Sequence, residues 1–393
     1  MSKVSLPEQS KGEAAMNSQL RIKTALSGGK PDRVPLVNVF SLPYLQSRLG
    51  MRDSIIKAFM ENPGILIDFQ EQVGHDPLIN LYWPQEPEIA VWPEAMIRWD
   101  EGEWHVAETV TERVETYRVI ERVIHTPRGS MTSVIRRGEC QNWVLKHPFE
   151  DDTPLELLDY RPAPASMDLS AIQEYIQAAG DRAFSVMTIP GVWQEACALR
   201  GLDRLVCDLF DRKEWVLELL ERLADYSAAA AQRVAETGLD CIMINESYVG
   251  MGMSPETFED VILPFDKQII DAIKKTGCLC SYHVCGKSAR LLKIIAGSGV
   301  DAIETLSPPE LAGDVDLAAA KEEVGQQVAL WGGFNERVLA SRSRDAIAAE
   351  ARRCLAAAAD GGGYVLRGSG QVYEAMDDAL MELAQVVQEH GVY

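Results

Sequence analysis

The residues with the clearest chemical potential lie together in one short segment, residues 278–286, which reads CLCSYHVCG. In an extended strand, alternate side chains share a face. One face would carry Leu279, Ser281, His283 and Cys285, and the other Cys278, Cys280 and Tyr282. An imidazole and a thiolate two positions apart can both reach one tetrahedral zinc ion. A buried strand also uses cysteine as a small apolar residue and histidine as a core residue, so packing stays an equal alternative.

Two carboxylates follow or occupy other apolar runs. Glu246 comes directly after the run 241–245 (CIMIN), where it could be a zinc ligand, a partner of His283, a general acid or base, or a carboxylate near a helix end. Glu304 lies inside the run 302–306 (AIETL), and a carboxylate within a buried strand needs a partner or a task. We therefore predict catalytic roles for both glutamates.

Five further residues are candidates for binding a substrate or cofactor: Asn245, Tyr248, Trp331, Asn335 and Arg367. The first two flank Glu246. The others lie at glycine-rich exits from the last two apolar runs, where a backbone can approach an anion or a flat ligand, although such exits are also ordinary turns. Arg367 could bind a substrate carboxylate or form an internal ion pair.

The elements that must position these residues form a repeating pattern of short apolar runs separated by amphipathic stretches of helical period. The runs are residues 33–40, 183–188, 241–245, 278–285, 302–306, 327–331 and 363–366. Gly238 and Gly299 each precede a run and are expected to end a helix in the left-handed conformation. Runs that are apolar on both faces indicate a parallel sheet, and seven or eight of them favour a closed (β/α)8 TIM barrel of class α/β. No GxGxxG motif follows the first run, which disfavours a Rossmann fold.

Residues 86–147 depart from this pattern, because they alternate with period two and contain a Pro127-Arg128-Gly129 turn. This predicts an insertion of antiparallel β-hairpins after the second barrel strand, with one solvated face. It could act as a lid, a partner surface or a dimer surface, so a homodimer is one expectation. We expect residues 1–16 to be a flexible segment and residues 17–393 to form a single barrel domain.

Composition narrows the class of partner. Acidic residues outnumber basic residues by 59 to 38, which gives a formal net charge of −21 and disfavours nucleic acid and anionic membranes as partners. No stretch reaches the ~18 apolar residues that span a bilayer. The eight cysteines are too sparse for a disulfide framework. We therefore expect a cytoplasmic protein with reduced thiols.

With these residues in place, the chain resembles the uroporphyrinogen decarboxylase superfamily from about residue 19 to its end. The motifs that carry the resemblance are residues 30–36 (KPDRVPL), 187–192 (MTIPGV), 254–265 (SPETFEDVILPF), 283–286 (HVCG) and 331–333 (WGG). The resemblance implies a TIM barrel whose site lies at the carboxyl ends of the strands.

Within that superfamily, decarboxylases carry an arginine-rich stretch and a catalytic aspartate where this chain has residues 41–48 (SLPYLQSR). The HxC pair is instead similar to zinc-dependent methyltransferases that exchange a methyl group with a corrinoid protein, including methylcobamide:coenzyme M methyltransferases and O-demethylase components. By this resemblance His283 and Cys285 would be zinc ligands. Those enzymes take a third ligand from a cysteine after the last strand, where this chain reads LRGSGQ at 366–371. Glu246, Glu304 or a neighbouring cysteine would have to replace it.

Three functions are consistent with these observations. The leading one is a zinc-dependent methyltransferase that moves a methyl group between a small substrate (a thiol, or a methoxy or methylamine compound) and a methyl-corrinoid carried by a separate protein. The alternative enzyme is a cofactor-free decarboxylase of the uroporphyrinogen type. A barrel that binds a ligand without turnover is the third, because a fold alone does not determine a function.

Overall fold

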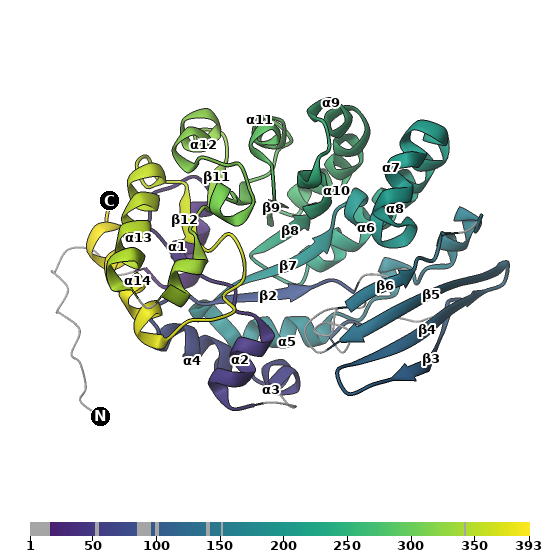
Figure 1. Cartoon of the computed structure of the whole chain (residues 1–393), viewed down its shortest axis with the longest axis horizontal. Coiled ribbons are helices and arrows are strands. Elements are labelled where there is room, and N and C mark those ends of the chain that lie inside the picture. Colours follow the sequence, from purple (N-terminus) through teal and green to yellow (C-terminus); the bar gives the residue numbers. More distant parts are fainter. Residues whose placement is uncertain are drawn as a thin grey trace.

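Eight parallel strands form the central sheet of the computed structural model (Figure 1), which describes residues 16–51, 55–84, 96–98, 102–138, 142–150, 152–341 and 343–393. The strands are β1 (Leu36–Val37), β2 (Leu78–Tyr82), β7 (Phe184–Pro190), β8 (Cys241–Asn245), β9 (Leu279–Val284), β10 (Ala302–Thr305), β11 (Ala329–Gly332) and β12 (Tyr364–Arg367). Their order in the sheet is β1-β12-β11-β10-β9-β8-β7-β2. This arrangement is a nearly closed parallel barrel, consistent with a TIM barrel.

Helices surround this sheet, as the apolar character of both strand faces predicts. They are α1 (Ser18–Leu26), α2 (Leu42–Leu49), α3 (Ile55–Glu61), α4 (Gly64–Gln72), α5 (Ser170–Ala179), α6 (Val192–Arg200), α7 (Leu202–Asp211), α8 (Lys213–Ala235), α9 (Pro255–Thr257), α10 (Leu263–Lys275), α11 (Leu292–Ala296), α12 (Leu317–Val324), α13 (Arg344–Ala358) and α14 (Asp377–His390). None of the helices within the described ranges is long and apolar enough to cross a membrane.

Local sequence signals account for several helix ends. The Asn17 side chain accepts a hydrogen bond from the backbone N–H of Leu20, which caps the start of α1. Gly238 (φ +89°) and Gly299 (φ +102°) adopt the predicted left-handed conformation just before β8 and β10. A side chain is strained at such φ values, so glycine allows the chain to turn directly from a helix into a buried strand.

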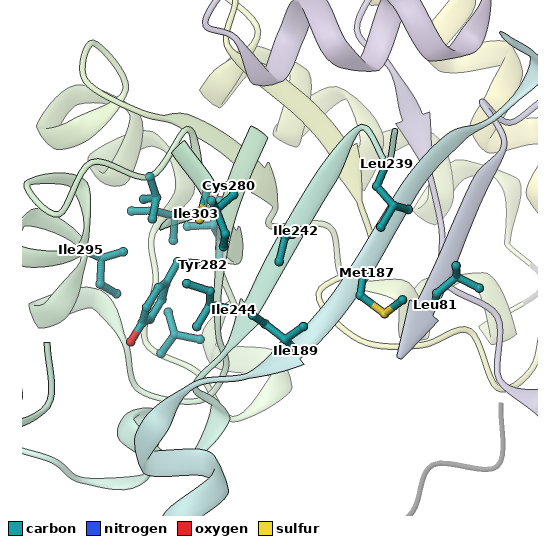
Figure 2. Close-up of a cluster of buried hydrophobic side chains, with 14 of the residues drawn as sticks. Leu81, Met187, Ile189, Leu239, Ile242, Ile244, Cys280, Tyr282, Ile295 and Ile303 are labelled. Carbon is teal, nitrogen blue, oxygen red and sulfur yellow. The ribbon is translucent and has the colours of Figure 1, made fainter. Parts of the chain in front are cut away.

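The strand residues divide between two hydrophobic clusters. The outer cluster packs the barrel against its surrounding helices and includes Ile242, Ile244, Cys280, Tyr282 and Ile303 (Figure 2). The inner cluster fills the barrel and contains Phe184, Val186, Cys241, Met243, Trp331 and Val365, together with Ile22, Ala25 and Leu26 of α1. Helix α1 therefore closes one end of the barrel interior. The outward position of Cys280 and Tyr282 agrees with the alternation predicted for residues 278–285.

A second, four-stranded antiparallel sheet occurs in the chain between β2 and β7, within the range 86–147 (Figure 1). Its strands are β3 (His105–Arg113), β4 (Tyr117–Thr126), β5 (Gly129–Gly138) and β6 (Asn142–Lys146). Thr126 pairs with Gly129, so β4 and β5 turn at the predicted Pro-Arg-Gly site. One face buries Ile120, Ile124, Met131 and Ile135. The first fifteen residues, to which we assigned flexibility, and residues 85–95, 99–101 and 139–141 lie outside the described residues.

Two barrel strands differ from the sequence interpretation. Strand β1 contains only Leu36–Val37 of the apolar run 33–40. Strand β2 was not among the predicted runs, because it reads LINLY, and its Asn80 and Tyr82 interrupt the apolar pattern. The eighth strand therefore had no strong signal of its own in the sequence.

Asp76 joins β1 to β2, the two strands at the ends of the sheet. Its backbone N–H donates to the Leu36 carbonyl at 2.8 Å, and its carboxylate accepts from the Leu36 N–H at 2.8 Å. The same carboxylate, which is fully buried, forms ion pairs with Arg21 at 2.5 Å and Arg33 at 2.7 Å. Burial alone would raise the pKa of Asp76, but the two guanidinium groups lower it below its ordinary value. One side chain thus connects α1, β1 and β2.

The neighbouring His75 is buried as a neutral imidazole. Its Nδ1–H donates to the Val73 carbonyl at 3.1 Å, and its Nε2 accepts from the Asn38 amide at 2.9 Å. Asn38 accepts in turn from the Gly368 N–H at 3.0 Å, just after β12. Burial lowers the pKa of His75 from 6.5 to about 4.

This depressed pKa predicts a pH-dependent contribution to stability. Between about pH 6.5 and 4 the unfolded chain binds a proton at His75 that the folded chain does not, so stability is full above this window and falls as the pH decreases. Relative to His75→Gln, the wild-type chain should lose about 3 kcal/mol of unfolding free energy between pH 7 and 4. Urea unfolding of both chains measures this difference, in which other titrating groups such as Asp266 cancel. Parallel stability curves would contradict the assignment.

Candidate active site at the carboxyl ends of the barrel strands

Neighbouring strands place four of the predicted site residues in one row. Asn245 of β8 pairs in register with His283 of β9, His283 with Glu304 of β10, and Glu304 with Trp331 of β11. All four lie at or near the carboxyl ends of their strands, where barrel proteins carry their functional groups. Residues far apart in the sequence are therefore adjacent because parallel strands are in register.

His283 and Glu304 form the polar centre of this row. The His283 Nδ1–H donates a hydrogen bond to Glu304 Oε2. The Glu304 side chain is fully buried, whereas the His283 side chain is 20% exposed. An ionised carboxylate can only accept hydrogen bonds, so the imidazole hydrogen lies on Nδ1 and the lone pair lies on Nε2. This is the arrangement by which proteins orient a histidine that binds a metal.

Arg367, at the end of β12, neutralises Glu304. Its Nη1 forms an ion pair with Glu304 Oε1, and its guanidinium lies over the Trp331 ring, 5.6 Å from the ring centroid. Burial lowers the pKa of Arg367 to about 10, against the opposing effect of the nearby Tyr82, so the group stays cationic at neutral pH. Of the two roles left open for Arg367, the structure contains the internal ion pair.

Cys285 follows β9 and is partly exposed. Burial alone would raise the pKa of its thiol, but interactions with the His283 side chain and with Ser247 lower it below the ordinary value. The thiol lies 4.0 Å from the Ser247 carbonyl oxygen. A side chain at Gly250 would place its Cβ only 1.8 Å from the Cys285 carbonyl oxygen, so glycine is required where these two loops meet. A more acidic, accessible thiol is a better nucleophile and metal ligand than an ordinary cysteine.

Glu246 has different partners from the ones expected for a zinc ligand or catalytic base. Its carboxylate is fully buried and accepts from the backbone N–H groups of Trp193 at 2.7 Å and Gln194 at 3.0 Å, at the start of α6. Asp266 accepts from the Val192 N–H at 3.0 Å beside it. Burial and then the proximity of Asp266 raise the pKa of Glu246 well above its ordinary value. Both oxygens thus accept hydrogen bonds from the amino end of a helix, and these bonds oppose the rise in the pKa without cancelling it.

The remaining predicted residues have local roles. Asn245 accepts hydrogen bonds from the N–H of Ser247 at 3.2 Å and from its hydroxyl at 2.6 Å. Asn335 accepts from the Arg337 N–H at 3.1 Å in the turn after β11. Tyr248 packs against the outer hydrophobic cluster. Trp331 is fully buried in the inner cluster, and its indole N–H has no hydrogen-bond partner among the described residues.

Three polar residues inside the barrel are not among the predicted site residues. The Thr188 hydroxyl of β7 donates to Asn80 at 2.8 Å, and the Asn80 amide donates to the Tyr82 hydroxyl at 3.0 Å, both on β2. Burial raises the pKa of Tyr82, and Arg367 opposes this effect. The signal was present in LINLY, because Asn80 and Tyr82 alternate on one face of an otherwise apolar strand.

The side chains present meet part of the requirement for zinc. Catalytic zinc usually has three protein ligands and one open position. His283 and Cys285 offer an imidazole nitrogen and a thiol of lowered pKa. Among the described residues, no group of three or more His, Cys, Asp and Glu side chains has an arrangement that could hold a metal ion. The donor chemistry thus fits two ligands, while the third is not part of a preformed cluster.

Comparison with known proteins connects this site to a family. A family model described as uroporphyrinogen decarboxylase (URO-D) matches residues 141–390. Two methylcobamide:CoM methyltransferases are similar in sequence: the protein from Methanosarcina mazei is 31% identical over 35% of this chain and 42% of its own length, and that from Methanosarcina acetivorans is 27% identical over 52% and 62%. A uroporphyrinogen decarboxylase from Streptomyces coelicolor is 28% identical over 45% of this chain and 47% of its length.

The chain therefore spans about half the length of these curated relatives. Among solved structures, a methyltransferase from Methanosarcina mazei has the same fold, with a TM-score of 0.66 at 18% identity, over 95% of this chain and 99% of that one. The resemblance that the motifs indicated is confirmed by the family match, which covers well over half of the 393 residues. The chain belongs to the uroporphyrinogen decarboxylase (URO-D) family.

Proposed function

We propose that this protein is a methyltransferase that moves a methyl group between a small substrate and a corrinoid carried by a separate protein, with a zinc ion bound by His283 and Cys285. The small substrate is a thiol, or a methoxy or methylamine compound. The observation that carries the proposal is the pairing of an imidazole whose Nδ1 is held by Glu304 with a thiol of lowered pKa, at the carboxyl ends of the barrel strands. The methylcobamide:CoM methyltransferases among the relatives support it.

The surroundings of both proposed ligands favour the form of the side chain that binds a metal. Nδ1 of His283 is occupied by Glu304, so Nε2 is the nitrogen available to a metal. The lowered pKa of Cys285 favours the thiolate, which is the form that binds metals. A bound zinc ion would supply Lewis acidity, which lowers the pKa of a substrate thiol or polarises a methoxy oxygen.

The chain's own residues would position the substrate for methyl transfer. In the thiol direction, the substrate sulfur attacks the methyl carbon on cobalt, the cobalt keeps the electron pair of the broken bond, and the thiol proton leaves. Arg367 and Glu304 neutralise each other, so the buried floor of the site adds no net charge. The polar residues Thr188, Asn80 and Tyr82 offer hydrogen-bonding groups on β7 and β2, which are two and three strands from β9 in the order of the sheet.

A spectral assay tests the proposal directly. The purified chain is loaded with zinc and mixed with free cob(I)alamin as a stand-in for the corrinoid protein, together with single methyl donors from the thioether, methoxy and methylamine classes. Methyl transfer should change the cobalt absorption spectrum with at least one donor. Failure with every donor class, by a folded chain that binds zinc, would reject the proposal.

A decarboxylase remains the second candidate, because relatives with that name match this chain over a similar share of its length. A substrate rich in carboxylates needs free cationic side chains. Two arginines are already paired in the structure, Arg48 of α2 with Asp377 and Arg367 at the end of β12 with Glu304. Release of carbon dioxide from uroporphyrinogen by the metal-free chain would establish this function instead.

A further inference from the structure

We propose that Arg367 is a positioning residue: acting through Glu304, it fixes the hydrogen of the His283 imidazole on Nδ1 and so keeps Nε2 available at the barrel mouth. This inference rests on the proposed function only in that Nε2 is taken to bind zinc. The interaction chain itself runs through three side chains from three strands, His283 of β9, Glu304 of β10 and Arg367 of β12.

The strand register explains how a residue two strands away reaches Glu304. Glu304 pairs with Trp331, and Trp331 pairs with Val365. Arg367 is two residues beyond Val365 on β12 and therefore points to the same inner face, nearer the barrel mouth. From there its side chain crosses the face of the Trp331 ring to meet Glu304.

The chemistry of the three side chains determines which group donates and which accepts at each contact. A guanidinium is a cation without acceptors, so the Glu304 oxygen that faces Arg367 is paired as an anion, and the other oxygen is turned toward His283. A fully buried carboxylate needs such a partner, because the protein interior does not solvate its charge. With Arg367 in place, the oxygen beside His283 has no hydrogen to donate, and Nδ1 must carry one. Without Arg367, nothing else described at Glu304 fixes this direction.

The matched control is a second buried arginine with the same kind of surroundings. Arg200 forms an ion pair with Asp208 at 2.6 Å, and its guanidinium lies 5.1 Å from the centroid of the Trp215 ring. It is 7% exposed, against 5% for Arg367. Replacing Arg200 thus removes a comparable buried cation from a site that does not contact His283.

The test is ¹⁵N nuclear magnetic resonance of the imidazole nitrogens in the metal-free chain at pH 8.5, well above the ordinary imidazole pKa of about 6.5. The chain has six histidines, so the His283 signals are assigned by His283→Gln. Wild-type and Arg200→Met should show the hydrogen of His283 on Nδ1 alone. Arg367→Met should show a mixture of the two tautomers, and Arg367→Lys should restore the Nδ1 form. A pure Nδ1 form in Arg367→Met overturns the proposal.

A second variant keeps the test decisive if Arg367→Met does not fold. In Glu304→Gln, Arg367 should hold the amide oxygen, which turns the NH₂ group toward His283 and moves the imidazole hydrogen to Nε2. Retention of the hydrogen on Nδ1 in this variant contradicts the proposal.

An activity measurement separates this inference from the proposed function. In the zinc-loaded chain, Arg367→Met should reduce kcat about 10- to 100-fold, with little change in KM. This is the usual effect of losing an interaction that orients a metal ligand. If the His283 tautomer changes in the variants as expected but the chain transfers no methyl group, the proposed function is rejected and the positioning role is supported. If the chain transfers methyl groups but the tautomer does not change, the positioning role is rejected and the proposed function is supported.

Discussion

Cys285→Ala and His283→Ala should each reduce methyl transfer by more than about 100-fold, the upper end of the effect of losing only a group behind a metal ligand. Each should also lower the zinc content from about one ion per chain. The reason is that both side chains are prepared as donors, one with its second nitrogen held by Glu304 and one with a lowered thiol pKa. Metal analysis and the cobalt spectrum measure the two effects separately.

Cys280→Ala is the matched control for this experiment. Cys280 lies in β9, the strand that Cys285 follows, but it is fully buried in the outer hydrophobic cluster, and burial raises the pKa of its thiol well above the ordinary value. Its removal should leave zinc content and methyl transfer unchanged. If Cys285→Ala behaves like Cys280→Ala, the thiol at 285 is not a ligand, and the proposed zinc site is wrong.

Asp76→Ala should reduce the free energy of unfolding by about 3–5 kcal/mol, because it removes the buried carboxylate that Arg21 and Arg33 share and takes an acceptor from the Leu36 N–H. Urea unfolding monitored by circular dichroism gives the difference. Asp68→Ala is the comparison, since the Asp68 side chain is 70% exposed in its ion pair with Arg182. Its loss should cost at most about 1 kcal/mol. Equal effects of the two substitutions would show that the buried pairs at Asp76 contribute little.

The sequence predicted the parts of the site that depend on local pattern. Strand β8 has the bounds of the apolar run CIMIN, and Cys280 and Tyr282 are buried on the face of β9 that packs outward. The expectation that Glu304 must have a partner is also met, since burial of a charge within a strand demands one whatever the fold. Alternation and the cost of burying charge are properties of short segments, so a single sequence contains them.

The residues whose roles the sequence left open depend on contacts between distant segments. Glu246 follows its strand as expected, but the backbone N–H groups that hold it come from Trp193 and Gln194, more than fifty residues earlier. No local pattern around Glu246 predicts that the start of α6 lies beside it in the fold. Likewise, Arg367 had two open roles until the register of β10, β11 and β12 placed it beside Glu304.

Asp76 lies where the ring of barrel strands closes, between β1 and β2. Seven parallel ladders join the eight strands, and each ladder consists of backbone groups that every sequence possesses. At the remaining position, between β1 and β2, no ladder is formed, and the two strands are joined through Asp76 by one backbone hydrogen bond to Leu36 and by a carboxylate with the arginines that hold it. Hydrogen exchange should therefore detect local opening first at this boundary. Because β1 and β2 share no ladder, they can separate while the seven ladders between the other neighbouring strands stay intact. Backbone ladders thus hold most of the ring, whereas a single backbone hydrogen bond and a buried ion-pair network hold it at one point.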